Sequence, residues 1–191
     1  MDRIVTAAST VDAVSGHLTA QAGIISSTKL LSALEGVFAD KAAWEAMPQD
    51  TPVYAVEMLK DESEGTPGGL FFGTSFIFPG TVGNEYFMTK GHFHEKRECA
   101  EYYWGIAGEG LLLLLQEDGT VRAERVERGS VHYIAGFVGH RLVNTGDTTL
   151  TVGACWPSDA GHDYGSIAQS GFPVRAVRGA DGKPQLIKQE D

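Results

Sequence analysis

The chain has 191 residues, the size of one compact domain with at most a modest extension. Its 25 acidic residues outnumber its 15 basic ones, so a net charge of −10 disfavours binding to the nucleic-acid backbone. A hydrophobic fraction of 42% excludes a disordered chain, and no apolar run is long enough to cross a membrane. The 24 glycines exceed an average share of roughly 7%, which indicates tight turns between short strands.

The first segment, 1–50, is predicted to be a helical or irregular arm that belongs to the same domain. Ser26 or Ser27 is suited to cap a helix through residues 29–47, where apolar residues recur at intervals of three and four. A glycine and an aspartate interrupt this pattern, so two short helices fit it as well as one long helix.

The start of the chain and its cysteines indicate the cellular compartment. Asp2 beside Arg3, with no continuous hydrophobic stretch after them, does not resemble a secretory signal. Cys99 and Cys155 are too few for a disulfide framework. We therefore expect a cytoplasmic protein with reduced thiols.

From residue 51 onward, short runs of β-branched and aromatic residues alternate with turn residues. This spacing predicts an all-β fold, an antiparallel barrel spanning 51–175. The sequences EDGT at 117–120 and NTGD at 144–147 predict hairpin turns. The charged segment 176–191 is predicted to be a surface tail.

The segment around His92 and His94 carries the most informative pattern. In a strand, these two side chains project from the same face, where they can share one divalent metal ion. Either Glu98 or Glu101 satisfies the spacing of a carboxylate ligand, because each is followed seven residues later by a glycine. We favour Glu101, which opens a strand-like run, whereas Glu98 lies in a charged segment that is typical of a loop.

A fourth ligand is expected on a later strand. His140 lies in the run GHRLVN, just before the predicted turn at 144–147. A barrel would bring this strand beside the first pair of histidines. Three imidazoles and one carboxylate leave positions open for substrate oxygens or water. His132 lies in a different phase of its own run, so we expect a structural role for it.

These motifs resemble the two motifs of the cupins, the first from Gly83 to Gly108 and the second from Gly129 to Asn144. A narrower resemblance, through SFIFPGTVGNEYFMTKGHFH, AEYYWGIAGEG and CWPSDAGHDYGSI, is to the cupin-type glucose-6-phosphate isomerases of archaea and some bacteria. It covers most of residues 30–175 and implies a single cupin barrel. In the second motif, Phe137 stands where glycine is usual.

The resemblance implies a homodimeric enzyme of glycolysis and gluconeogenesis that interconverts glucose 6-phosphate and fructose 6-phosphate. It implies one divalent metal ion per subunit, most often Fe²⁺, with Mn²⁺, Ni²⁺ or Zn²⁺ as alternatives. The acidic charge and the lack of a long apolar run predict no nucleic-acid or membrane partner. The implied ligands are His92, His94, Glu101 and His140. The implied catalytic residues are Glu101, His140 and Tyr164. The implied substrate-binding residues are Tyr54, Ser75, Thr89, Gly91, Tyr103, Trp156 and His162.

Two of the substrate positions differ from the family pattern. Ser75 stands where threonine is more usual. Trp156 stands where tyrosine is common, and its indole keeps a hydrogen-bond donor but lacks the hydroxyl acceptor of tyrosine. Because the chain is acidic and has no phosphate-binding loop, phosphate recognition must rely on local donors. We favour Thr89 over Lys90 for this role, because Lys90 reads as an exposed strand lysine.

The residues are compatible with more than one reaction. A metal ion could stabilise an enediolate while Glu101 moves the proton, or it could polarise the substrate for a hydride shift. The open alternatives are a phosphomannose isomerase, an iron dioxygenase and a sugar-binding cupin without catalysis. The ligand set does not separate glucose 6-phosphate from mannose 6-phosphate.

Overall fold

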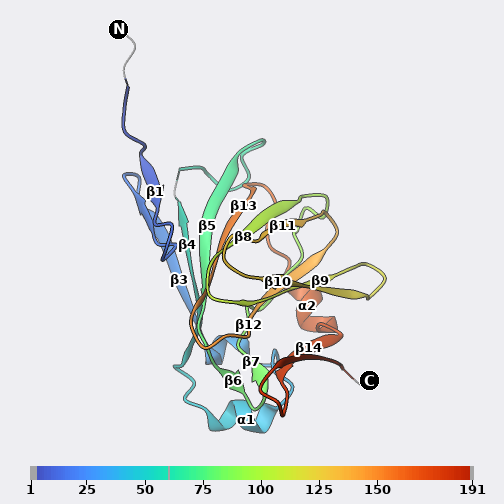
Figure 1. The fold of residues 1–191 in the computed structure, drawn as a ribbon. Coiled ribbons are helices and arrows are strands. Elements are labelled where there is room, and N and C mark those ends of the chain that lie inside the picture. The colour runs from blue at the N-terminus through green and yellow to red at the C-terminus, as the bar shows by residue number, and fades with distance from the viewer. Residues whose placement is uncertain (1–3, 60, 190–191) are drawn as a thin grey trace.

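The computed structural model describes residues 4–59 and 61–189, and strands predominate over helices in this part of the chain (Figure 1). The predicted all-β barrel is confirmed, whereas the segment 1–50, predicted to be a helical or irregular arm, contributes a strand to the main sheet. No described helix has the length and apolar character needed to span a membrane.

The larger sheet has six antiparallel strands in the spatial order β11-β8-β13-β5-β4-β3. Strands that lie far apart in the sequence are thereby brought together, as β13 lies between β8 and β5. The strands are β3 (Ile24–Leu30), β4 (Pro52–Leu59), β5 (Leu70–Ile77), β8 (Glu101–Ala107), β11 (Val131–Ile134) and β13 (Leu150–Pro157).

The smaller sheet has the order β10-β9-β12, with β9 at Gly110–Leu115, β10 at Val121–Val126 and β12 at Gly139–Asn144. Isolated bridges from Met88 to Val143 and from His92 to His140 extend it by an irregular segment. The core lies between the two sheets and combines side chains of both, such as Leu112 and Leu114 with Ile77, all almost fully buried. Burial of this apolar surface is the main stabilising contribution.

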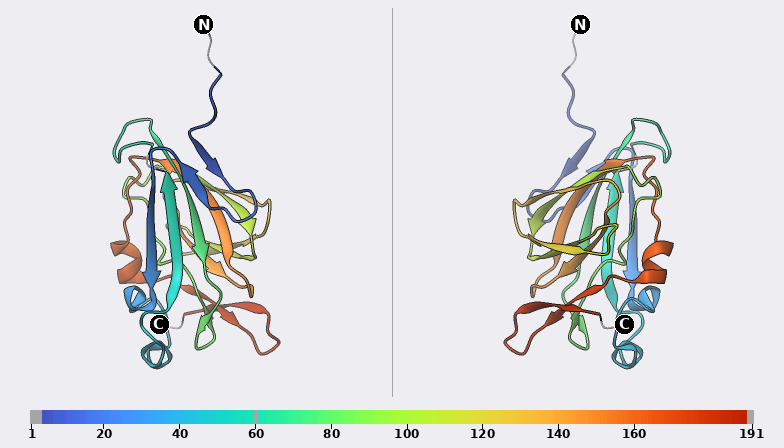
Figure 2. Two further views of the ribbon diagram at one scale, coloured as in Figure 1. Left: turned by 90° about the vertical axis from the view of Figure 1, so that its left-hand side faces the viewer. Right: turned by 90° about the vertical axis from the view of Figure 1, so that its right-hand side faces the viewer.

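Several short elements gather at one end of the barrel, and others lie along its sides (Figure 2). A further sheet has the order β15-β14-β7-β6, and β1 pairs with β2. The bounds are β1 (Ser9–Val11), β2 (Leu18–Ala20), the 3-10 helix η1 (Leu31–Leu34), α1 (Lys41–Ala46), β6 (Thr81–Val82), β7 (Glu85–Tyr86), α2 (Gly165–Ser170), β14 (Val174–Arg178) and β15 (Pro184–Lys188).

The predicted helix cap at Ser26 or Ser27 is wrong, because both serines lie in β3. This strand pairs with β4 from Ile24 opposite Leu59 onward, so the backbone groups on that side are satisfied by the sheet. The helical character appears later, in η1 and α1, as two short helices. The N-cap of α1 is Asp40, whose carboxylate accepts a hydrogen bond from the Ala43 backbone N–H at 2.8 Å.

Of the two predicted hairpin turns, only the one at 117–120 joins paired strands, β9 and β10. The turn at 144–147 instead carries the chain from β12 in one sheet to β13 in the other. Asn144, which is fully buried, donates to the carbonyl oxygens of Ile77 and Thr148 at 2.8 Å each and accepts from Gly146 at 2.9 Å. The Asn144 side chain therefore satisfies backbone polar groups where the chain crosses from one sheet to the other.

The segment predicted to be a surface tail, 176–191, is partly built into the fold. Ala176 and Val177 of β14 are buried, and β14 pairs with both β7 and β15. All of β15 is exposed. Residues 190 and 191 lie outside the described part of the chain.

Among the described residues other than glycine, only Phe137 has a positive φ, of 65°. Left-handed backbone costs an L-residue roughly 1–2 kcal/mol, and glycine, the residue expected here from the cupin motif, avoids that cost. Both Phe137→Gly and Phe137→Ala remove the half-exposed ring, so they differ mainly in the cost of the positive φ. We expect the free energy of unfolding of Phe137→Gly to exceed that of Phe137→Ala by about 1 kcal/mol, because glycine adopts this φ without strain. Urea denaturation measures the difference; equal stability of the two variants would contradict it.

Candidate metal centre and substrate pocket

The predicted ligands His92, His94, Glu101 and His140 lie together, with one ligand atom from each within 4.8 Å of the others. Two come from the segment after β7, Glu101 is the first residue of β8, and His140 is the second residue of β12. Glu98 lies in an exposed turn, outside this cluster. The arrangement can hold a metal ion.

Single backbone bridges hold the histidine pair in place. The His92 backbone N–H donates to the carbonyl oxygen of His140 at 3.2 Å, and the His140 backbone N–H donates to the carbonyl oxygen of His92 at 2.9 Å. Phe93 is bridged to Asp163 on the opposite side of the segment. The expected strand is therefore an extended segment with isolated bridges, yet His92 and His94 still face the same cluster.

The imidazole rings are oriented by their outer nitrogens. His94 Nδ1 is 2.8 Å from the carbonyl oxygen of Cys99, and His140 Nδ1 is 3.3 Å from that of Val138. Donation to these carbonyls leaves Nε2 as the free lone pair that points inward, the tautomer that a metal requires.

The inward atoms have no hydrogen-bond partners of their own. His92 Nε2, His94 Nε2, His140 Nε2 and Glu101 Oε1 are buried and make no hydrogen bond, although Glu101 Oε1 is only 2.6 Å from His140 Nε2. Buried polar atoms without partners are costly. Their convergence on a common point is the geometry of ligands that share a cation, so the residues present fit a divalent metal.

Burial and charge set the protonation states. Burial, with the nearby His140 and His162, keeps the pKa of His92 well below its ordinary value, so this ring is neutral. Burial alone would raise the pKa of Glu101, but His140 and His94 outweigh it and lower that pKa. Burial would lower the pKa of His94, and contact with Glu101 raises it instead. Metal binding would displace a proton held there.

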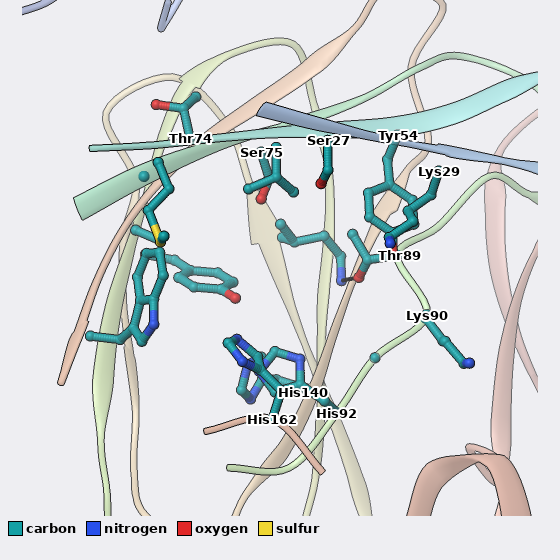
Figure 3. A pocket seen from close by; sticks show the side chains of 18 of the residues that line it. Ser27, Lys29, Tyr54, Thr74, Ser75, Thr89, Lys90, His92, His140 and His162 are labelled. Atoms are coloured by element: carbon teal, nitrogen blue, oxygen red, sulfur yellow. Dashed lines mark hydrogen bonds between the residues drawn. The ribbon is translucent and has the colours of Figure 1, made fainter. Parts of the chain in front are cut away.

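A cavity of about 280 Å³ opens above the cluster and is lined by His92, Glu101 and His140. In Figure 3 these histidines face Ser75, Ser27 and Thr89 across the open space. One end thus carries imidazoles and a carboxylate, and the other end carries hydroxyl groups. Such a pocket suits an elongated polar ligand with two chemically different ends.

The predicted catalytic residue Tyr164 and all the predicted substrate-binding residues line this cavity: Tyr54, Ser75, Thr89, Gly91, Tyr103, Trp156 and His162. Thr89 Oγ1 accepts from the Leu142 backbone N–H at 3.1 Å, so its own proton remains available to a ligand. Burial raises the pKa of Tyr54 to about 12, so its hydroxyl stays protonated and can donate.

Trp156 fits because its neighbour across the sheet is small. A Cβ atom on Gly73 would lie 3.0 Å from the Trp156 ring and 2.7 Å from the Glu57 carbonyl oxygen. At the rim, the Tyr164 and His162 rings stack with centroids 5.8 Å apart and planes 8° apart.

His132 lies outside the pocket. Its ring is hydrogen-bonded to Glu124 at 2.6 Å and to Ser130 at 2.9 Å, as expected of a structural histidine.

The lining residues that the sequence did not indicate include Ser27 and Lys29, and Lys90, expected to be an exposed strand lysine, also lines the cavity. Ser27 and Lys29 are two residues apart on β3, so they face the cavity together with Ile25. The predicted helix over 29–47, capped at Ser26 or Ser27, hides this alternation within IISSTKL. Figure 3 shows Lys29 beside Tyr54 at the mouth, whereas Lys90 points away from the histidines.

Comparison with known proteins gives consistent matches along most of the chain. A family model described as "Glucose-6-phosphate isomerase (GPI)" matches residues 28–190. The glucose-6-phosphate isomerase of Thermococcus litoralis is 42% identical over 146 residues, 76% of this chain and 77% of that protein. That of Pyrococcus horikoshii is 40% identical over 156 residues (80% and 82%), and that of Sinorhizobium medicae is 38% identical over 180 residues (92% and 82%).

Solved structures with a similar chain path have much lower sequence identity. A mutant of Bacillus subtilis oxalate decarboxylase matches with a TM-score of 0.46 and 20% identity, over 62% of this chain and 29% of that one. Oxalate oxidase matches with a TM-score of 0.45 and 13% identity, over 78% and 58%. The chain thus spans less than a third of the oxalate decarboxylase and somewhat more than half of the oxalate oxidase.

Proposed function

Because the chain belongs to the glucose-6-phosphate isomerase family, we propose that it interconverts glucose 6-phosphate and fructose 6-phosphate with one divalent metal ion per subunit. The ion would be held by His92, His94, Glu101 and His140. Fe²⁺ is the first candidate, and Mn²⁺, Ni²⁺ and Zn²⁺ suit the same imidazole and carboxylate donors. The observation that carries the proposal is the convergence of four buried ligand atoms at the floor of the pocket, which contact one another and have no hydrogen-bond partner.

Each end of the cavity has a role in this proposal. When bound, the metal supplies positive charge that polarises a carbonyl and stabilises negative charge on the neighbouring oxygens. Glu101 is ionised and lines the pocket, so it is placed to move a proton between adjacent carbons. His140 orients the substrate oxygens from the opposite strand, and Tyr164 covers the rim and restricts water.

The phosphate would lie at the mouth. Thr89, Ser75 and Tyr54 offer hydroxyl donors. The backbone polar groups around Gly91 and the positive charge of Lys29 would add to them. Tyr103, Trp156 and His162 would contact the sugar between the two ends. Neutral donors and one nearby lysine would therefore bind the phosphate even though the chain has a net charge of −10.

A coupled assay with fructose 6-phosphate tests the proposal directly. We expect turnover that is lost on treatment with EDTA and restored by Fe²⁺. Mannose 6-phosphate run beside glucose 6-phosphate defines the stereochemistry accepted at C2. Turnover that survives complete removal of metal would rule out the metal-dependent reaction.

Lys29→Met is expected to raise the KM for fructose 6-phosphate about tenfold with little change in kcat, since it removes one charge-assisted contact to phosphate. Lys41→Met is the matched control, because Lys41 lies on α1 beside Glu45 and away from the pocket. Steady-state kinetics measure both variants. An equal KM in the two would exclude Lys29 from phosphate binding.

We also propose a cytoplasmic homodimer without nucleic-acid or membrane partners. The exposed edge strand β11 carries Val131 and Tyr133, and Tyr133 lies opposite Tyr102 with ring centroids 5.2 Å apart. All three are more than half exposed, which is an apolar patch suited to a second copy of the chain. Tyr133→Lys is expected to shift the mass in light scattering from dimer to monomer, whereas Glu109→Lys, away from this patch, should not.

A further inference from the structure

A second cavity, also of about 280 Å³, lies beside the substrate pocket and shares Lys90 with it. It is enclosed by the segment after η1, by the end of α2 and by the start of β14. Its charged lining residues are Lys90, Arg141, Arg175 and Glu35. Gly91 lines the substrate pocket and lies against two residues of the second cavity, since a Cβ atom there would lie 2.9 Å from the Phe172 ring and 3.1 Å from Arg141 Nε.

Arg141 is the central residue of this cavity. It is only 5% exposed, donates through Nη2 to the Lys90 carbonyl oxygen at 2.7 Å, and stacks on Phe172 at 4.4 Å. Its Nε is buried and has no hydrogen-bond partner, and within the described chain it forms no ion pair. A buried guanidinium without a counter-anion is costly.

The surrounding charges do not neutralise it. Arg175 is paired with the buried Glu85 at 2.8 Å and also donates to the Val37 carbonyl oxygen at 3.0 Å. Arg175 Nε is likewise buried without a partner. Lys90 is half-buried, and the only acidic lining residue among those described, Glu35, is exposed at the rim. The interior therefore has excess positive charge and two unused donors.

We propose that this cavity binds a small dianion, a phosphate monoester or a dicarboxylate, at a site separate from the isomerase pocket. Guanidinium groups recognise both chemistries through charge-assisted hydrogen bonds. The volume exceeds that of inorganic phosphate alone, so it accommodates a ligand with a few carbon atoms. The site depends on Arg141 and Arg175, and the inference does not require the isomerase activity.

Ala168 provides a matched pair of variants, because it lines this cavity but not the other and is exposed on α2. Isothermal titration of the metal-loaded full chain with inorganic phosphate, at low ionic strength, should detect two sites. Ala168→Glu should weaken one of them about tenfold or more through like-charge repulsion, and Ala168→Lys should retain it. Arg141→Gln should remove the same site, with its melting curve recorded as a test of folding.

Ser75→Asp identifies the other site, because it places a negative charge in the substrate pocket. A parallel titration with malonate distinguishes the ligand source: binding of phosphate, malonate or both at the Ala168-sensitive site supports the proposal and tells which anion the site accepts. A single phosphate site that responds to Ser75→Asp and not to Ala168→Glu, together with no malonate binding that Ala168→Glu weakens, would overturn it. Failure of the isomerase proposal would appear instead in the turnover assay, so the two results are separable.

Discussion

Replacing His92 by alanine is expected to lower kcat/KM for fructose 6-phosphate by about a thousandfold, since loss of metal polarisation removes several kcal/mol of transition-state stabilisation. His92 Nε2 is one of the four buried ligand atoms without a hydrogen-bond partner. The bound metal per chain, measured by mass spectrometry, should fall in parallel. Addition of excess Fe²⁺ should restore only part of the activity.

His132→Ala is the matched control, because it also removes a buried imidazole, 5% exposed. Its ring is bound by Glu124 and Ser130 and lies outside the cluster. We expect this variant to lose stability, by about 1–3 kcal/mol, while it keeps its metal and its kcat. Equal loss of metal in the two variants would contradict the assignment of His92 as a ligand.

Glu101→Gln is expected to lower kcat by about a hundredfold or more even at saturating metal, which is the usual range for loss of a general base. The substitution keeps the size of the side chain and one carbonyl oxygen, but it removes the negative charge. A ligand role alone would weaken metal binding, and added metal would then recover the rate. Steady-state kinetics across a series of Fe²⁺ concentrations separate the two roles.

His94→Gln is the comparison for this experiment. His94 lies in the ligand cluster, but it does not line the substrate cavity of the described chain. Excess metal should therefore recover His94→Gln more fully than Glu101→Gln. Exchange of deuterium from heavy water into the sugar, present in the native enzyme and lost in Glu101→Gln, would favour proton transfer. Equal recovery of both variants with unchanged exchange would limit Glu101 to metal binding.

The ligand cluster was predictable because the residues that carry it follow a short-range rule. Alternation places His92 and His94 on one face whether the backbone forms a full ladder or, as observed, single bridges. Strand character favours Glu101 as the ligand and loop character disfavours Glu98, and Glu101 opens β8. Local sequence pattern is sufficient for both of these predictions.

Other features depended on partners distant in the sequence. The run IISSTKL has apolar residues and serines that fit a helix start, and only pairing with β4 makes it an edge strand that points Ser27 and Lys29 into the pocket. The turn at Asn144 has hairpin chemistry, but the strands on either side belong to different sheets. Local propensity is similar for both outcomes, and long-range hydrogen bonds decide between them.

The sequence alone determined the all-β class, the ligand types and their spacing, because periodicity and side-chain chemistry are local properties. The tertiary structure decided which strands share a sheet, and therefore that the N-terminal arm contributes Lys29 to the substrate pocket. It also decided that Arg141 lies buried without an ion pair among the described residues, beside a second cavity. Burial and charge balance at a point in space are sums over residues from the whole chain, and no local pattern contains them.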